Sequence, residues 1–190
     1  MNKGQHGYMN QYKRNLLISI IILGLFVIAG VVFTIILFDT RKSIFIIIPI
    51  LIALPLAKQL VAYLLCANFK ELTNEEYEKL KKLEYFNEPS ITYDISISRY
   101  EGIIYFPVAV IRDGRMLFYY NGAFGKKISD ENELKKIIQA SFEGQKKNYV
   151  IIISTDIDDF VAKARKIKAP NDDFVCSDEK IRNRLFELGL

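Results

Sequence analysis

The chain has 190 residues and a net charge of +4 at pH 7, but the charge is divided unevenly along it. Residues 1–70 carry seven basic residues and one acidic residue, a net charge of +6, whereas residues 71–190 carry 19 basic and 21 acidic residues. A nucleic-acid-binding domain would gather positive charge on its polar part, so this distribution excludes a nucleic acid as a partner. The two cysteines have no partner at motif spacing, which excludes a disulfide framework and favours a reducing compartment.

The first predicted element is an apolar helix over residues 16–38, a run without a charged residue. Such a helix is about 35 Å long, enough to cross a hydrocarbon core of about 30 Å. The run is too long for the core of a signal peptide, and no small-residue cleavage site follows it, so we predict an uncleaved anchor. The polar residues 1–15 are predicted to form a disordered cytosolic tail.

A second apolar run follows the predicted turn at residues 39–43 and is interrupted by Pro49, Pro55, Lys58 and Gln59. Each proline removes a backbone donor and is expected to bend the helix. The part before Lys58 is too short to cross a bilayer, so the second span is predicted to cover residues 44–65.

This length places Lys58 near the membrane interface and leaves two interpretations open. The lysine snorkels, with its stem among lipid chains and its ammonium among headgroups. Alternatively, Lys58 and Gln59 form a functional polar contact with a lipid phosphate or a partner protein.

The basic residues that flank the two runs predict their orientation. They lie before the first run, after the second and, less densely, in the turn: Lys3, Lys13 and Arg14; Lys70, Lys79, Lys81 and Lys82; Arg41 and Lys42. The positive-inside rule then places both termini in the cytoplasm. Residues 16–69 are therefore predicted to be a two-helix transmembrane hairpin, in a multi-pass protein of the cell membrane.

Residues 70–190 predict a cytosolic α+β domain in the order helix, three antiparallel strands, helix, strand, helix, helix. Thr73 and Glu76 have the spacing of a capping box, and the helix that they open is expected to end near residue 87. Strands are predicted at 91–98, 103–111 and 116–120, with Asp113-Gly114 as the turn between the second and third.

The second half of the domain predicts a helix from Asp130, a buried parallel strand at 149–153, a helix opened by a capping box at Thr155 and a last helix from Ser177. In the first strand, isoleucines alternate with Thr92, Asp94, Ser96 and Ser98. This alternation favours a strand with one solvated face; the alternative is a small polar site around Asp94.

Three aspartates, Asp156, Asp158 and Asp159, directly follow the buried strand. Strand ends of this kind are common ligand sites, and three carboxylates suit a magnesium ion. Aspartate is also ordinary in the first turn of a helix, where it caps backbone donors and favours the helix dipole. Capping is the preferred interpretation, and a metal site is the alternative.

Residues 122–127 form a glycine-containing segment that ends in Lys126 and Lys127. It is not a phosphate-binding P-loop, because its glycines are too close together and Lys127 stands where serine or threonine would hold magnesium. We expect a simple loop. The alternative is that the two lysines bind an anion or a lipid headgroup.

Most catalytic systems are excluded by a missing residue type, since His6 is the only histidine and it lies in the predicted tail. Ser-His-Asp and Cys-His nucleophiles, zinc centres and two-histidine iron centres all need histidine in the domain. We therefore expect no enzyme activity and no cofactor.

The element order over residues 73–154 resembles the core of the restriction-endonuclease-like fold of the PD-(D/E)XK family. The nucleases of that family carry an acidic residue on the second strand and Glu-x-Lys or Asp-x-Lys on the third. Here residues 103–111 contain no acidic residue, and residues 115–120 contain neither a carboxylate nor a lysine. The resemblance thus implies a fold without its catalytic site. The overall layout also resembles that of uncharacterised bacterial two-helix membrane proteins.

The sequence favours a membrane-anchored, non-catalytic interaction or ligand-sensing module that acts with a protein partner, as a homo-oligomer or as a subunit of a membrane complex. Two alternatives stay open. One is a metal-dependent carboxylate enzyme with its site near Asp156. The other is a lipid-headgroup-binding domain that uses Lys126, Lys127 and the lysines at 79–82.

Overall fold

The computed structural model describes residues 3–38, 47–88, 90–99, 102–122, 131–142, 149–168 and 172–189. The chain divides into two compact units. One, Asn10–Asn68, is called the helical unit below; the other combines Met1–Met9 with Phe69–Leu190 and is called the domain. The predicted turn at 39–43 lies outside the described residues.

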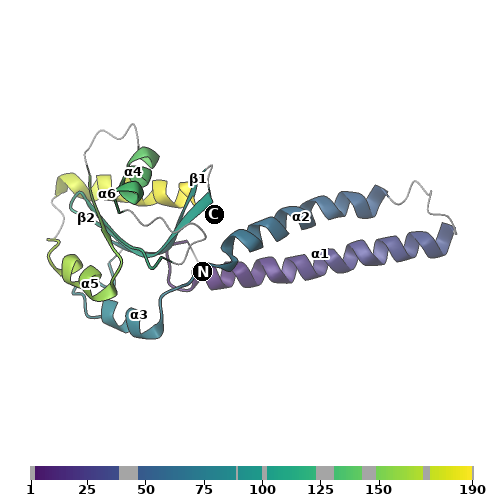
Figure 1. The fold of residues 1–190 in the computed structure, drawn as a ribbon, viewed down its shortest axis with the longest axis horizontal. Coiled ribbons are helices and arrows are strands. Elements are labelled where there is room, and N and C mark those ends of the chain that lie inside the picture. The colour runs from purple at the N-terminus through teal and green to yellow at the C-terminus, as the bar shows by residue number, and fades with distance from the viewer. Residues whose placement is uncertain are drawn as a thin grey trace. The chain divides into compact units, whose positions relative to one another are not determined.

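The helical unit contains most of α1 (Tyr8–Phe38) and all of α2 (Ile47–Ala67), which run side by side (Figure 1). Both helices are long and apolar enough to cross a membrane. Helix α1 begins at Tyr8 rather than at residue 16, so residues 8–15 are helical and not a disordered tail. The apolar pattern fails to mark this start because these residues are polar.

The two helices approach closely where Gly30 of α1 faces Pro49 of α2. A Cβ atom at Gly30 would lie 3.0 Å from Cγ of Pro49, whereas at Gly24 no described atom lies within 4 Å. Pro49 is in the first turn of α2, where the missing N–H costs no helical hydrogen bond. Pro55 lies inside the helix, which continues past it to Ala67.

The domain opens with α3 (Asn74–Leu80), and both hydrogen bonds of the predicted capping box between Thr73 and Glu76 are present. The helix ends at Leu80, earlier than expected. Beyond it the chain makes tight turns in which Leu83 N–H bonds to the carbonyl of Leu80 and Phe86 N–H to that of Leu83. Leu80 and Leu83 are still buried together in the core, so the apolar spacing indicated burial correctly but not helix length.

A single four-stranded sheet has the order β1 (Ile91–Arg99), β2 (Gly102–Arg112), β3 (Arg115–Tyr119) and β4 (Val150–Ser154). The first three strands are antiparallel, and β4 is parallel to β3. Asp113 and Gly114 have φ angles of +51° and +67°. Two positive angles in succession match the turn expected for a tight hairpin, so the predicted Asp-Gly turn is confirmed.

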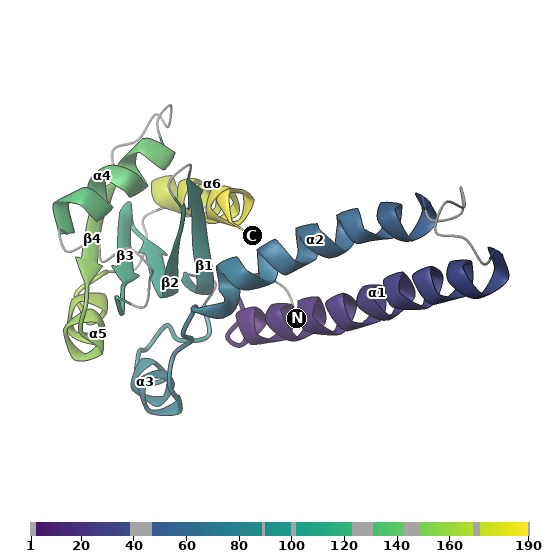
Figure 2. The same ribbon diagram turned by 45° about the vertical axis from the view of Figure 1, so that its right-hand side comes forward.

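Helices cover both faces of the sheet, as Figure 2 shows. On one face α3 and α5 (Ile157–Arg165) enclose a core with Phe160 at its centre. On the other, α4 (Glu131–Ser141) and α6 (Asp172–Leu188) enclose a second core. Helix α6 begins before the predicted Ser177, and the cap of α5 is Asp156 rather than Thr155. The structure thus confirms two long apolar helices followed by a small mixed sheet with helices.

Strand β1 changes face at Asp94, and this overturns the expectation of a solvated face. Ile91 and Tyr93 pack in the first core, yet Ile95 and Ile97 pack in the second. Asp94 has a φ of +54°, a left-handed conformation that interrupts the alternation of side chains. As a result Thr92, Asp94 and Ser96 are only 1%, 7% and 4% exposed.

Candidate functional site

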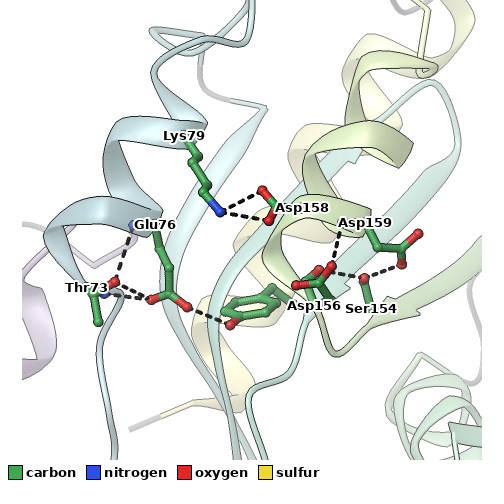
Figure 3. Close-up of polar contacts among 8 residues, drawn as sticks. Thr73, Glu76, Lys79, Ser154, Asp156, Asp158 and Asp159 are labelled. Carbon is green, nitrogen blue, oxygen red and sulfur yellow. Dashed lines mark hydrogen bonds and ion pairs between the residues drawn. The ribbon is translucent and has the colours of Figure 1, made fainter.

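Each of the three aspartates after β4 forms a hydrogen bond or ion pair with a different group (Figure 3). Asp156 caps α5, and its Oδ2 accepts a hydrogen bond from the N–H of Asp159 at 3.2 Å. Asp158 forms an ion pair with Lys79 of α3 at 2.7 Å. Asp159 pairs with Lys163 at 2.6 Å and accepts the hydroxyl of Ser154.

These contacts account for the pKa shifts of Asp159 and of its neighbour Lys79. The hydrogen bond from Lys163, followed by that from Ser154, lowers the pKa of Asp159. The hydrogen bond to Asp158 raises the pKa of Lys79. Within the described part of the chain, no three acidic, histidine or cysteine side chains are grouped to hold a metal ion. The capping interpretation is confirmed for Asp156, and the other two carboxylates form surface ion pairs.

The lysine candidates belong to two separate segments, α2 and residues 122–127. In α2, Lys58 is exposed, while Gln59 is half-buried and its Oε1 is covered and has no hydrogen-bond partner among the described residues. The two neighbours therefore differ in exposure within the helical unit. Lys126 and Lys127 lie outside the described residues.

A pocket of about 780 Å³ lies beside β1, and we call it the β1 pocket. Its wall combines N-terminal residues 3–6 with side chains from α3, from the turn after α3, from β1 and from α6. The volume is in the range of small-molecule sites, roughly 300–1,000 Å³. All of its lining residues belong to the domain.

The N-terminal wall of the β1 pocket is fixed to the edge of the sheet through Gly4. The N–H of Tyr93 donates to the carbonyl of Gly4 at 3.0 Å. Gly4 has a φ of +87°, and a Cβ atom there would lie 2.5 Å from Cζ of Phe186 and 3.1 Å from Cγ2 of Thr92. Only glycine meets both the backbone conformation and the space at this position.

Aromatic side chains form much of the pocket wall. The ring of His6 stacks on Tyr77 of α3, with 4.1 Å between centroids and 14° between planes. Tyr93 meets His6 edge to face at 5.6 Å, and Phe86 meets Tyr77 in the same way at 5.6 Å. Phe186 of α6 completes this lining. The wall therefore offers several ring edges and faces, which suit a planar ligand.

Two hydroxyl groups in the wall of the β1 pocket are buried without a partner. Neither Oγ1 of Thr92 nor the phenolic oxygen of Tyr93 has a hydrogen bond within the described residues. The two residues are 1% and 8% exposed. Buried polar groups are normally hydrogen-bonded, and one left unsatisfied costs about 1–3 kcal/mol. Both oxygens are covered by other atoms, so neither is open to the pocket, and neighbouring side chains of a strand point to opposite faces of the sheet.

The charged residues around the pocket leave it with a positive balance. Lys3 and Arg182 contribute cations, and Lys3 Nζ donates to the carbonyl of Phe186 at 3.2 Å. Glu88 is the acidic residue in the lining, and it forms an ion pair with Arg112 at 3.0 Å. Arg112 thus offsets the charge of Glu88.

Next to the pocket on β1, Asp94 receives the start of α1. Its carboxylate accepts the N–H of Met9 at 3.1 Å and the hydroxyl of Tyr105. Burial raises the pKa of Asp94 in spite of these bonds, which favour the charged form. Tyr105 in turn stacks on Phe69, with 4.8 Å between centroids. Met9 and Phe69, the residues of the domain that border the helical unit, thus both contact this Asp94–Tyr105 pair.

Sequence reasoning missed both the pocket and this pair. It placed His6 in a disordered tail and preferred a solvated face for Asp94, with a small polar site as the alternative, whereas both residues are held in the domain. The contact between Met9 and Asp94 spans 85 positions. No local pattern indicates such a contact; the one available signal was the run of polar residues on an otherwise apolar strand.

Comparison of the chain with protein-family models, with curated proteins and with solved structures found no match in any of the three.

Proposed function

We propose that this protein is a membrane-anchored, non-catalytic ligand-sensing module, in which α1 and α2 span the bilayer and the domain binds a small molecule in the β1 pocket. One observation carries the proposal: residues 3–6 form part of the pocket wall, and α1 begins at Tyr8. A ligand in the pocket would therefore touch the segment of chain that leads directly into the first apolar helix.

The contacts of this segment support a mechanism for sensing. Gly4 is held by β1, and the N–H of Met9 in the first turn of α1 is held by Asp94. A ligand that binds one arrangement of the segment more tightly than another shifts the population toward it. The start of α1 then follows the occupancy of the pocket, because the two are separated by only a few residues.

The membrane part of the proposal rests on the length and composition of the two helices and on the flanking charges. Both helices pass the length and hydropathy requirement for a span. Basic residues are denser at the outer ends of the hairpin than in the turn, which favours a multi-pass protein of the cell membrane with both termini in the cytoplasm. The partners are then the bilayer, the ligand and a protein that reads the state of α1, which includes a second copy of this chain.

The alternatives lose their structural support. A carboxylate enzyme needs ligands that converge, whereas Asp156, Asp158 and Asp159 are each engaged by a different partner. A headgroup site at the lysines near 79–82 is weakened because Lys79 is paired with Asp158 and Lys81 with Glu78. The fold resemblance to the PD-(D/E)XK family stays a proposal about architecture and adds no activity.

Orientation is tested by thiol labelling of cells that express single-cysteine variants. Cys66 and Cys176 are replaced by serine, and cysteine is introduced at Ser43, in the turn that the sequence predicts, or at Ser141 in α4. A membrane-impermeant maleimide should label the Ser43→Cys protein in intact cells and the Ser141→Cys protein only after lysis. The reverse pattern, or equal labelling of both, contradicts the proposed topology.

Coupling is tested without knowledge of the ligand by Gly4→Ala, which displaces the pocket wall. Hydrogen exchange of the full chain in lipid nanodiscs should be faster at Tyr93 and at Met9 than in the wild type. If exchange rises at Tyr93 and stays unchanged at Met9, the pocket wall and the start of α1 are independent, and the sensing mechanism is wrong.

A further inference from the structure

We propose that two copies of this chain pair through the outer edge of β4, antiparallel and about a twofold axis at Ile152, so that their two sheets become one continuous sheet. The interface lies at the edge of the sheet opposite β1, so the inference goes beyond the proposed function and does not depend on it. It follows from the backbone groups of β4, from its side chains and from the charges of α5.

Strand β4 pairs with β3 and forms an outer edge of the sheet (Figure 2). The N–H of Val150 donates to the carbonyl of Gly114 at 3.1 Å, and the carbonyl of Ser154 accepts the N–H of Tyr120 at 2.9 Å. In a strand, the N–H and C=O of one residue point to the same side, and those of the next residue point to the other side. The two bonds therefore turn Val150, Ile152 and Ser154 toward β3.

The N–H and C=O groups of Ile151 and Ile153 consequently point away from the sheet. Within the described part of the chain, neither residue has a hydrogen bond beyond the pairing with β3. The opposite edge differs, since there the N–H of Tyr93 in β1 is bound to the carbonyl of Gly4. Unpaired backbone groups at an edge are a template for another extended strand, and β4 is the edge that the described residues leave open.

The side chains of β4 do not protect this edge. The strand reads Val-Ile-Ile-Ile-Ser and contains no charged residue or proline, which are common means by which edge strands avoid pairing. Among the described residues outside α1 and α2, the exposed large apolar side chains are Val150 and Val175, and Val150 is 58% exposed. The edge therefore combines open backbone groups with exposed apolar surface.

A second copy of β4 matches this edge. When Ile152 lies opposite Ile152 of the second copy, Ile151 lies opposite Ile153 of the second copy and exchanges both backbone hydrogen bonds with it. The twofold axis repeats this pair, so the outward groups of both residues are satisfied in both copies. Apolar side chains then meet apolar side chains across the contact, which stabilises the pairing of the strands.

Helix α5 has room beside its own copy in this arrangement. It packs on β3 and β4, and a twofold axis perpendicular to the sheet makes the two copies of α5 antiparallel. With neighbouring strands about 4.8 Å apart, two helices that each lie over the β3–β4 pair are roughly 10 Å apart, which is the distance between packed helices.

The charges of α5 favour this antiparallel direction. Asp158 and Asp159 lie in its first turn, and Lys163 and Arg165 lie in its last turn. The acidic end of one copy therefore faces the basic end of the other, whereas a parallel arrangement would bring like ends together. Both aspartates already have ion pairs, so the arrangement avoids repulsion and needs no free charge.

Disulfide crosslinking of the full chain in membranes of expressing cells tests the register. In the background without Cys66 and Cys176, cysteine is introduced at Ile152, which the proposal places opposite itself, or at Val150. Directly opposed residues are close enough for a disulfide, whereas the two copies of Val150 would be about 14 Å apart. Mild oxidation should give a covalent dimer with Ile152→Cys and about tenfold less with Val150→Cys, although Val150 is the more exposed residue.

Three results of the crosslinking overturn the proposal. Equal crosslinking of the two variants, or more at Val150, contradicts the register. Absence of a dimer with Ile152→Cys contradicts the contact itself. Crosslinking of Ile152→Cys to a different protein, without a homodimer, shows that the edge takes another chain and not a second copy.

The oligomeric state in detergent gives a second readout that does not alter the half-buried Ile152. Light scattering over a concentration series should show wild type changing from monomer to dimer. Val150→Asp places a carboxylate opposite Ser154 of the second copy, which is bound to Asp159, and should weaken the dimer about tenfold. The control Val175→Asp changes a similarly exposed valine of α6 and should leave the dimer intact. A wild type that stays monomeric, or a dimer that Val150→Asp leaves unchanged, overturns the interface.

Discussion

Two polar regions of the domain differ in how far their groups are satisfied. At the end of β4, Asp156, Asp158 and Asp159 lie on the surface, and each has a partner nearby. Beside β1, Thr92 and Tyr93 are buried, and their hydroxyls have no partner within the described residues. In the first region every aspartate named here has a hydrogen-bond or ion-pair partner. In the second region the two hydroxyl groups have none within the described residues.

Under the proposed function, the region beside β1 is the ligand site and the end of β4 is not. Exposed ion pairs contribute little to stability. Their charges are already paired, so they offer no unpaired charge to a bound molecule. Buried unsatisfied groups and a left-handed aspartate cost free energy, and such costs are concentrated at functional sites. A high density of charged residues at the end of β4 therefore does not by itself indicate a ligand site.

The largest expected effect comes from Gly4→Ala in the pocket wall. Its Cβ would lie 2.5 Å from the Phe186 ring, and the variant also places alanine at a positive φ. Gly122→Ala is the control, since Gly122 has a φ of +66° and no described atom within 4 Å of its Cβ position. Gly4→Ala should lower the free energy of unfolding by about 1–3 kcal/mol more than the control. Equal losses in denaturant melts would mean that the wall is not packed as described.

The second effect is a pH dependence at Asp94. Because burial raises its pKa in the folded protein, the folded state holds this proton more tightly than the unfolded chain does. The contribution of Asp94 is full below the ordinary carboxyl pKa of about 3.9 and is lost as the pH rises through the raised folded value. Asp94→Asn does not titrate, so wild type should lose stability relative to this variant as the pH rises above about 4. If urea melts showed that wild type gains stability relative to Asp94→Asn as the pH rises, the raised pKa of the buried Asp94 carboxyl would be wrong.

Asp159 at the end of β4 should show the opposite sign. Lys163 and Ser154 lower its pKa, so its contribution is present above the ordinary carboxyl pKa and disappears as the pH falls through the lowered value. Asp159→Asn should thus be less stable than wild type at pH 7, and the difference should vanish in acid. For each variant, the stability difference from wild type is plotted against pH. Slopes of the same sign for Asp94→Asn and Asp159→Asn would contradict the contrast between the two regions.

A smaller effect is expected between the two regions, where the Tyr119 hydroxyl donates to Glu76 at 2.7 Å. Tyr119→Phe removes this bond and should cost about 0.5–1.5 kcal/mol. Tyr120→Phe, in the next position, removes a buried hydroxyl that has no partner within the described residues and should be neutral or stabilising. Thermal melts of the two variants give the comparison directly, and equal losses would argue against the Glu76 bond.

The smallest effect belongs to the exposed pair of Lys79 and Asp158. Lys79→Met should leave stability unchanged within error, because solvent and salt screen a pair whose side chains are 40% and 68% exposed. A measurable loss that persists in high salt would show that the end of β4 is more than a set of surface contacts.

Local patterns predicted the features that local physics decides. The Thr73–Glu76 capping box and the Asp113-Gly114 turn both depend on neighbouring residues, and both are present. The face change at Asp94 was not predictable, because it depends on Tyr105 and on Met9, which lies 85 positions away. The same distant contact explains why the start of α1 and the wall of the β1 pocket were missed.

The central claim is that a change in the wall of the β1 pocket alters the start of α1. Amide hydrogen exchange of the full chain in lipid nanodiscs tests this claim most directly, with Gly4→Ala compared with the control Gly122→Ala. We expect Gly4→Ala, but not the control, to speed exchange at Tyr93, whose N–H is bound to Gly4, and at Met9, whose N–H is bound to Asp94. Faster exchange at Tyr93 without any change at Met9 would contradict the claim.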